Sequence, residues 1–432
     1  MSNQDSVSRR NFMGSAALAG AAVSFPNVLT AKSKGKEVIR FALIGCGGRG
    51  KGAAAQVMNS PHKTECVALA DAFMDTAKGA QNYLKHVGHE DKLKVTDDTI
   101  FAGLDAYKKV MEMDNVDLVL LTTSPGFRPL HFEHAVNKGK HVFMEKPVAT
   151  DAPGIRTVLA AAKEADKKNL KVVCGLQRRY QEKYLQTKEQ VDKGVIGDIN
   201  YGQVYWNGAG VWVRKRTEGQ SEMEYQMRNW YYFNWLCGDH IVEQHVHNID
   251  VMNWFKGGPP VKAQGMGGRE VRVGEDFGEI FDHHYVEFTF ADGSVMNSQC
   301  RHQPGAMNRV TEIIGCQKGK AYPGRIVDAA GKTVWRFKGK DNNAYQTEHD
   351  VLYQHIRDDK PINNAYYTAA STMTAILGRM ATYSGKELKY DQALASEISI
   401  MPKVYDWDAE PGPKAGADGL YPAPIPGKHK VV

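Results

Sequence analysis

The 432-residue chain carries 55 Lys and Arg residues against 49 Asp and Glu residues, a formal net charge of +6 at pH 7. The positive charge is spread without long basic blocks, so it gives no indication of nucleic-acid binding. Six cysteines lie scattered without a C-x-x-C pair, which argues against a zinc knuckle or a small disulfide scaffold, although an oxidising compartment would still allow a disulfide. The length indicates two domains.

The N-terminus has the pattern of an export signal. Arg9 and Arg10 precede a short, weakly apolar run at 14–23, as in twin-arginine (Tat) signals, with cleavage expected near Ala31. The alternative is a disordered basic N-terminus. No other segment has ~18 uninterrupted apolar residues, so we expect a soluble mature protein without stable membrane insertion, periplasmic or otherwise exported through the Tat pathway.

The next feature is an apolar run at 38–44 that ends in the spacing G-x-G-x-x-G. The run predicts a buried parallel strand, and the glycines predict a tight turn that brings the backbone and the next helix N-terminus to a pyrophosphate. The loop residues predicted to bind the cofactor are Gly45, Cys46, Gly47, Gly48, Arg49 and Gly50.

A second apolar strand at 66–70 ends in Asp71, which lies 21 residues after Gly50. This spacing is close to the ~20 residues expected for the acid that binds the ribose hydroxyls of a dinucleotide. A carboxylate there favours NAD, because it repels the 2′-phosphate of NADP. The guanidinium of Arg49 could instead bind this phosphate well, and NADP therefore stays the alternative.

Strands and helices then alternate along the first half. Apolar strands are predicted at 116–123, 141–144 and 171–175, with helices at 129–138 and 152–169. Alternating elements of this kind build a doubly wound parallel sheet, whose ligands bind at the carboxyl ends of the strands. The further cofactor-binding candidates at these strand ends are Thr123, Ser124, Pro125, Glu145 and Lys146.

The second half changes to β-strand patterns. A strand is predicted at 199–206, a hairpin at 285–298 around Asp292-Gly293, and another strand at 311–315, which together indicate a mostly antiparallel sheet packed with helices. The tail is rich in Pro and Gly and is predicted to be extended. The predicted domains are a signal at 1–31, an NAD-binding domain at 36–151, a substrate and oligomerisation domain at 152–405 and a tail at 406–432.

These motifs together resemble the Gfo/Idh/MocA oxidoreductase family. The resemblance rests on the glycine loop, Asp71, the stretch 139–147 ending in Glu145-Lys146-Pro147, and the helical stretch 372–380. It implies an α/β fold: an N-terminal Rossmann domain, then a C-terminal α/β domain whose large, mostly antiparallel open sheet often mediates oligomers. It therefore implies a homodimer or homotetramer, and a Lys146 that touches both the substrate hydroxyl and the nicotinamide region.

Many members of the family carry D-x-x-x-H on a later helix, with another Asp three residues after the His. The matching residues here are Glu243, His247 and Asp250, and the i,i+4 spacing predicts that Glu243 and His247 share a helix face. The resemblance implies that His247 is the general base, with a pKa near the working pH, and that Lys146, Glu243 and Asp250 complete the catalytic group. For His247 the alternative is a hydrogen-bonded core histidine.

The same stretch also allows a metal site. His240, Glu243, His245 and His247 are residue types that bind metals. However, a His-x-His pair on one helix points in two directions, so we predict no metal there.

Two further groups are candidates for the site. Gln177, Arg178 and Arg179 follow a strand end and resemble family residues near the nicotinamide; we assign the first two to the cofactor and Arg179 to the substrate, with a solvated basic turn as the alternative. Aromatic faces stack on sugar rings, and two or three of six aromatic residues are expected in the site, with Trp230 and Tyr232 as the candidates. The six are Trp206, Trp212, Trp230, Tyr231, Tyr232 and Trp235.

The sequence thus predicts an exported oxidoreductase that transfers a hydride from a hydroxyl of a sugar or glycoside to tightly bound NAD. One alternative is an NAD-dependent, redox-neutral glycosidase that oxidises the sugar, eliminates the aglycone, adds water and reduces again. Two others are a metal-assisted keto-glycoside lyase or hydrolase and a non-catalytic sugar sensor.

Overall fold

Six parallel strands form the first sheet of the structure, a computed structural model that describes residues 37–432. Their order across the sheet is β3-β2-β1-β4-β5-β6, which is a doubly wound arrangement and confirms the prediction. The strands are β1 (Ile39–Ile44), β2 (Thr64–Asp71), β3 (Ile100–Ala102), β4 (Leu118–Leu121), β5 (His141–Met144) and β6 (Val172–Cys174). The predicted export signal at 1–31 lies outside the described residues.

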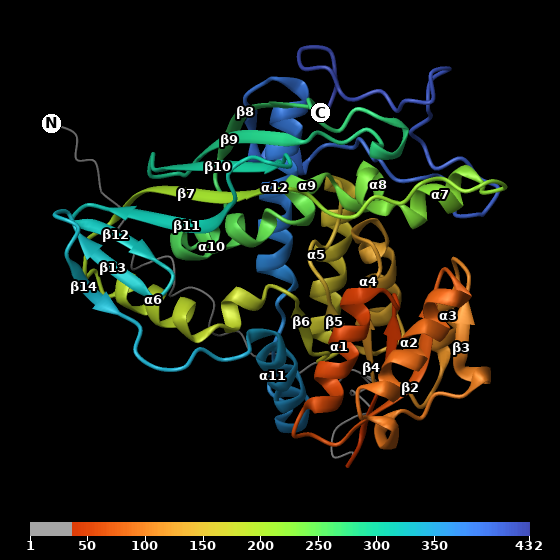
Figure 1. Cartoon of the computed structure of the whole chain (residues 1–432). Helices are drawn as coiled ribbons and strands as arrows, with labels where there is room; N and C mark the ends of the chain where they lie inside the picture. The colour runs from red at the N-terminus through yellow and green to blue at the C-terminus, as the bar shows by residue number, and fades with distance from the viewer. Residues whose placement is uncertain (1–36) are drawn as a thin grey trace, which may run out of the picture.

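Helices cover both faces of this sheet (Figure 1). They are α1 (Gly48–Asn59), α2 (Met74–His86), α3 (Ala106–Glu112), α4 (Arg128–Asn137) and α5 (Ala152–Lys167). On β1, Phe41 and Leu43 pack in one core cluster with residues of α1 and α2, whereas Ala42 and Ile44 join residues of α3 and α4. Because both faces are buried, the strand is apolar at every position except Arg40. β6 pairs with β5, so the sheet extends past residue 151, the predicted end of this domain.

Nine strands form the second sheet, in the order β14-β13-β12-β11-β7-β10-β9-β8-β15. Neighbouring strands are antiparallel except β7 and β10, which are parallel, so the sheet is mostly antiparallel as predicted. The predicted hairpin is confirmed: β9 and β10 pair with Thr289 opposite Val295. The strands are β7 (Ile199–Gly208), β8 (Lys262–Gly268), β9 (His283–Thr289), β10 (Val295–His302), β11 (Arg309–Cys316), β12 (Gly319–Tyr322), β13 (Arg325–Asp328), β14 (Thr333–Arg336) and β15 (Leu388–Lys389).

Two long helices follow β14 in the chain and pack against the first domain (Figure 1). α11 (Ala344–Asp358) places Leu352, Tyr353 and Ile356 in the core cluster that holds α1. α12 (Ala365–Ser384) packs against α5 of the first domain and against β8 and β9 of the second. The second sheet is therefore packed through α12 onto the first domain. The remaining helices are α6 (Glu182–Asp192), α7 (Glu222–Arg228), α8 (Asn234–Cys237), α9 (His240–Glu243), α10 (Val246–Lys256) and α13 (Tyr390–Leu394).

The C-terminal tail, residues 406–432, is described throughout and contains turns but no helix or strand. It runs past α8 and α7 (Figure 1), and Tyr421 in it is buried. Within residues 37–432, no helix combines the length and apolar character needed to cross a membrane.

Candidate active site

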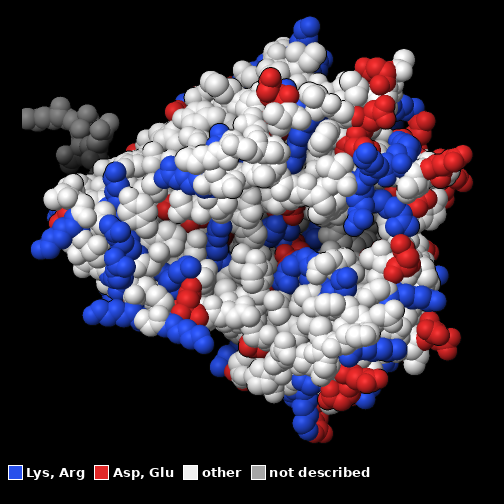
Figure 2. Space-filling model, in the orientation of Figure 1, with Lys and Arg blue, Asp and Glu red and all other residues white. Residues whose placement is uncertain are grey.

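A cavity of about 1160 Å³ lies between the carboxyl ends of the first sheet and the segments around α7, α9 and α10. Figure 2 shows the surface hollowed at this position, with Lys and Arg side chains around the hollow. The cavity brings together most of the residues predicted from sequence. Those that line it are Gly45, Gly47, Gly48, Arg49, Asp71, Thr123, Ser124, Pro125, Glu145, Lys146, Trp230, Glu243 and His247.

The glycine loop has the shape that a bound dinucleotide requires. Gly45 has φ +95°, and a Cβ on it would lie 2.4 Å from the Thr123 amide nitrogen. A Cβ on Gly50 would lie 2.0 Å from the Gly45 carbonyl oxygen, so a side chain would push α1 off the strand. A Cβ on Gly47 or Gly48, by contrast, would meet nothing within 4 Å. These two positions leave open the space that a pyrophosphate occupies at the start of α1, so the loop fits NAD.

Asp71 ends β2 at the wall of this cavity. Its Oδ2 accepts a hydrogen bond from the Cys46 amide at 2.7 Å, and its Oδ1 accepts one from the Phe73 amide at 3.0 Å. Burial raises the pKa of the Asp71 carboxyl. The two amides fix the carboxylate where the ribose hydroxyls are expected, and each oxygen retains a lone pair for them.

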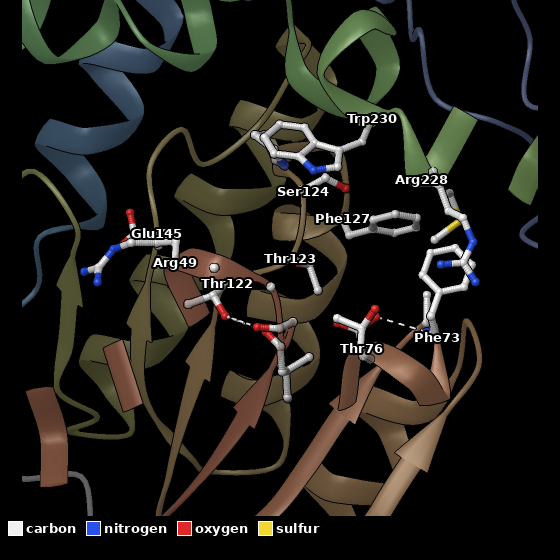
Figure 3. A pocket seen from close by; sticks show the side chains of 18 of the residues that line it. Arg49, Phe73, Thr76, Thr122, Thr123, Ser124, Phe127, Glu145, Arg228 and Trp230 are labelled. Atoms are coloured by element: carbon white, nitrogen blue, oxygen red, sulfur yellow. Dashed lines mark hydrogen bonds and ion pairs between the residues drawn. The ribbon is translucent and has the colours of Figure 1, made fainter. Parts of the chain in front are cut away.

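Arg49 points away from Asp71. Its Nε donates to Glu145 Oε1 at 2.5 Å and its Nη2 donates to Glu348 Oε1 at 3.1 Å. Figure 3 shows Arg49 beside Glu145, on the opposite side of the pocket from Phe73. Because two carboxylates hold this guanidinium, it is not positioned to offset the repulsion between Asp71 and a 2′-phosphate.

Lys146 and Glu243 meet inside the cavity. Lys146 Nζ donates to the Glu243 carbonyl oxygen at 2.6 Å and to Glu243 Oε1 at 3.2 Å. Both side chains are almost buried, with exposed fractions of 11% and 13%. This contact joins the end of β5 to α9, so the two domains each contribute one group to the same site.

His247 lies in the same cavity, but the predicted continuous helix is wrong. α9 ends at Glu243 and α10 begins at Val246, so Glu243 and His247 stand on separate helices. The His247 ring stacks on the Trp206 indole at 5.9 Å between centroids. None of the described residues forms a hydrogen bond with this ring, whose Nδ1 is buried. His247 is therefore not the hydrogen-bonded core histidine of the alternative interpretation.

The pKa of His247 differs from the expected value near neutrality. Burial lowers it well below the ordinary histidine value, and the charges of Lys146 and Arg178 add to the effect. Glu243 does not offset these effects, because its carboxylate faces Lys146. The imidazole is consequently neutral, and no described residue forms a hydrogen bond with its ring nitrogens.

Seven predicted site residues do not line the cavity. Cys46 and Gly50 belong to the glycine loop but are buried. Gln177 Nε2 donates to the Tyr345 hydroxyl at 3.1 Å, and Tyr345 lines the cavity, so Gln177 is one residue removed from it. The hydroxyl of Tyr232 donates to the Trp212 carbonyl oxygen at 3.0 Å inside the core.

The remaining three residues form ion pairs of the second domain. Arg179 donates to both oxygens of Asp250, with Nη2 to Oδ1 at 2.8 Å and Nε to Oδ2 at 2.9 Å, and Ser371 also donates to Asp250. Arg178 forms an ion pair with Glu312 on β11. Asp250 and Arg179 satisfy one another away from the cavity, so we withdraw the catalytic role of Asp250 and the substrate role of Arg179. Arg178 is not the solvated turn residue of the alternative interpretation.

Three of the six candidate aromatic residues line the cavity; of the two named candidates, Trp230 lines it and Tyr232 does not. The three are Trp206, Trp212 and Trp230. Trp212 and Trp230 pack edge to face at 5.8 Å between centroids. Tyr231 and Trp235 are buried in the core with Tyr232.

A contact between the domains, not predicted from the sequence, closes one end of the cavity. The guanidinium of Arg228 on α7 lies 3.9 Å from the centroid of the Phe73 ring, and its Nη1 donates to Asp75 Oδ2 at 3.3 Å. Trp407 of the tail packs against the same Phe73 ring at 5.4 Å. Figure 3 shows Arg228 over Phe73 at the edge of the pocket. In the sequence, Glu224 and Arg228 show an i,i+4 pair, but nothing indicates their partners in the first domain.

The four residues of the metal hypothesis do not converge. His245 Nε2 hydrogen-bonds to Ser298 Oγ at 2.7 Å, on the side away from His247, and Glu243 pairs with Lys146. Among the described residues, the one cluster with ligand-like spacing is Asp239, His240 and His284. Asp239 already accepts hydrogen bonds from the Phe281 amide and the Tyr383 hydroxyl, and it pairs with His240. We therefore interpret this cluster as a hydrogen-bonded part of the core.

Two family models match the chain. One, for the oxidoreductase family with the NAD-binding Rossmann fold, covers residues 39–173; the other, for the GFO/IDH/MocA C-terminal domain, covers residues 184–321. The chain belongs to the Gfo/Idh/MocA oxidoreductase family. Its first domain is the NAD-binding Rossmann domain of that family, in agreement with the predicted cofactor.

The proteins to which this chain is similar have names of several kinds. Inositol 2-dehydrogenase/D-chiro-inositol 3-dehydrogenase of Halalkalibacterium halodurans is 30% identical over 163 residues, which are 37% of this chain and 42% of that protein. Glycosyl hydrolase family 109 protein 1 of Bacteroides fragilis is 26% identical over 184 residues, 40% of this chain and 38% of that protein. The chain thus spans less than half the length of each of these relatives. The structure of aldose-aldose oxidoreductase from Caulobacter crescentus superposes with a TM-score of 0.63 at 18% identity, over 81% of this chain and 99% of that one, which shows the shared fold.

Proposed function

We propose that this protein is an exported oxidoreductase that oxidises a hydroxyl of a sugar or glycoside with NAD. The observation that carries the proposal is a single cavity that contains the glycine loop with Asp71 and, in addition, the side chains of Lys146, Glu243 and His247. Residues that bind a dinucleotide and residues that handle a proton are thereby placed within reach of one another.

The walls of the cavity support a carbohydrate substrate. Trp206, Trp212 and Trp230 offer aromatic faces beside the proton-handling groups, and amphipathic aromatics of this kind bind the apolar faces of sugar rings. Of the relatives named above, one is a dehydrogenase of inositols, which are polyhydroxylated rings, and another is a glycosyl hydrolase.

In the proposed mechanism, Lys146 Nζ donates a hydrogen bond to the oxygen of the reacting hydroxyl and stabilises the negative charge that develops there. Its present contacts with Glu243 hold it in the cavity and set its direction. His247 accepts the hydroxyl proton at its free ring nitrogen, because burial keeps the ring neutral. Bound NAD supplies the hydride acceptor. Trp206 fixes the plane of the imidazole.

The contact of Arg228 with Phe73 supports a cofactor that stays bound. It covers the end of the cavity next to Asp71, where the adenosine ribose is expected. The twin-arginine pattern at residues 9–10 supports export in the folded state, with the cofactor loaded beforehand. A retained cofactor favours a closed redox cycle, in which the hydride returns to the same sugar or passes to a second sugar; the alternative is an external carrier that collects the electrons.

The redox-neutral glycosidase is the second candidate. It is supported by the relative named as a glycosyl hydrolase of family 109 and uses the same residues for the oxidation step. The two functions differ in their products, since the glycosidase releases an aglycone and leaves no oxidised sugar.

Single-turnover reduction of the bound nucleotide tests the proposal. Protein that retains its NAD is mixed with a panel of glycosides, and NADH fluorescence and aglycone release are followed together. We expect at least one glycoside to reduce the bound nucleotide, and His247→Ala to abolish this reduction. His245→Asn is the matched control, because His245 faces Ser298 rather than the cavity. Lasting NADH indicates the dehydrogenase, transient NADH with aglycone release indicates the glycosidase, and absence of NADH with every glycoside contradicts both.

A further inference from the structure

A second cavity, of about 930 Å³, lies between α12 and the C-terminal tail. It shares no lining residue with the nucleotide cavity. Apolar side chains form much of its wall, among them Ile376 and Met380 of α12, Met401, and Ile425 of the tail. An apolar wall of this kind suits a small organic ligand when a few polar groups point into it.

Arg379 of α12 supplies the first polar group. Its side chain lines this cavity and is 5% exposed. No described residue forms an ion pair or hydrogen bond with its guanidinium, and its Nη1 is fully buried without a partner. A largely buried guanidinium with no counter-ion among the described residues is costly, so its position favours an anion.

Glu279 supplies a second polar group on the same wall. Its Oε1 accepts a hydrogen bond from the Asn234 amide at 2.8 Å, while its Oε2 is buried without a partner. Burial raises the pKa of the Glu279 carboxyl to about 7. Near neutral pH a large part of this group is therefore protonated and able to donate a hydrogen bond into the cavity.

We propose that this cavity binds a small organic carboxylate. The carboxylate pairs with the planar guanidinium of Arg379, which matches it in a two-point hydrogen-bonded geometry. The apolar body of the ligand fills the space between α12 and the tail. The neutral form of Glu279 complements an anionic ligand, because it adds a donor without adding negative charge.

The tail forms the outer wall of this site. Ser396 Oγ donates to the Val431 carbonyl oxygen at 3.0 Å, and the His429 ring packs edge to face against Tyr383 at 5.8 Å between centroids. A ligand that contacts both Arg379 and Ile425 would link the tail to α12. We therefore expect ligand binding to slow amide hydrogen exchange in residues 422–431.

Calorimetric titration of the NAD-containing protein with benzoate and hexanoate tests the proposal, with benzamide and hexanamide as neutral matches. We expect saturable binding of at least one carboxylate and at least tenfold weaker binding of its amide. Arg379→Met should weaken carboxylate binding at least tenfold. Arg214→Met is the control for binding in the nucleotide cavity, which Arg214 lines, and should leave the carboxylate affinity unchanged.

Arg379→Lys keeps the positive charge and serves if Arg379→Met does not fold; it should bind the carboxylate more weakly than the natural protein. Equal binding of acids and amides, or unchanged binding in both Arg379 variants, overturns the proposal. Absence of carboxylate binding overturns it as well. If Arg379→Met then changes the oligomeric state by light scattering, the anion comes from a second copy of the chain; if it only raises the Tm, water solvates the guanidinium.

Discussion

Replacement of Arg228 by Ala is expected to accelerate release of the nucleotide. Arg228 belongs to the second domain, whereas Phe73 and Asp75 belong to the first, so both of its contacts must break before this end of the cavity opens. The side chains of Arg228 and Asp75 are 32% and 67% exposed. We therefore assign to both contacts the free energies that are typical of exposed interactions. A cation–π contact of this kind contributes about 0.5–1 kcal/mol. An exposed ion pair contributes about 0.2–1 kcal/mol.

The two contacts together amount to about 0.7–2 kcal/mol. Since about 1.4 kcal/mol corresponds to a factor of ten, Arg228→Ala should raise the release rate roughly 3- to 30-fold. The assay mixes protein loaded with NADH with excess NAD in a stopped-flow instrument and follows the loss of the fluorescence of bound NADH. The fold of the variant is checked by its circular dichroism spectrum.

Arg216→Ala is the matched control for this measurement. Arg216 lies just before α7 and pairs with Glu222 and Tyr421, and it makes no contact with Phe73 or Asp75. Its release rate should stay within twofold of the natural protein. If Arg228→Ala also stays within twofold, the contact over Phe73 does not retain the cofactor, and the explanation for tight binding is wrong.

Three further predictions concern cofactor choice, catalysis and acid stability. Asp71→Ser removes the charge that repels a 2′-phosphate, so NADP binding should rise relative to NAD in competitive titrations; an unchanged ratio would show that another group reads the ribose. Lys146→Ala and His247→Ala should each lower kcat about 10²-fold or more at normal nucleotide content, whereas His245→Asn should keep kcat within a few-fold; full activity of His247→Ala would exclude it as the base. Burial lowers the pKa of His131 to about 3, so this histidine is neutral in the folded state and charges below pH 6.5 in the unfolded state. The unfolded state then binds more protons, and the free energy of unfolding should fall by about 1.4 kcal/mol per pH unit below pH 6.5 through this group. Urea unfolding at pH 7 and pH 5 should show a loss smaller by about 2 kcal/mol in His131→Phe, and an equal loss in both proteins would contradict this origin.

The first domain was predictable because its signals are local. Buried parallel strands must be continuous apolar runs, and the glycine spacing reports a backbone shape that a Cβ would forbid, as Gly45 and Gly50 show. Lys146 follows directly from its place after β5, since ligands bind at that end of a parallel sheet.

The second domain was less predictable, since its site depends on contacts between distant segments. The stretch from Glu243 to His247 has helical spacing, but the chain leaves the helix between them, and Glu243 turns to Lys146, 97 residues away. Asp250 follows His247 at the expected spacing, yet its carboxylate forms an ion pair with Arg179. The spacing of residues in the sequence does not determine with which of several polar partners a side chain pairs.

The contact of Arg228 with Phe73 had no signal in the sequence for the same reason. Phe73 and Arg228 lie 155 positions apart, and Trp407 comes from the tail. The residues around each of them in the sequence do not indicate its partners. Only the packing of α7 and the tail across the first domain brings them together.

Transfer of deuterium from substrate to bound nucleotide tests the central claim most directly. Protein that retains NAD is mixed with one equivalent of a glycoside deuterated at all ring carbons, without added nucleotide. The nucleotide is then released by denaturation, and its mass is measured by mass spectrometry. If the protein oxidises a sugar hydroxyl, a fraction of the nucleotide is recovered as NADH carrying one deuterium, and His247→Ala yields none. Recovery of unlabelled NAD alone, with every glycoside that binds, would contradict the account.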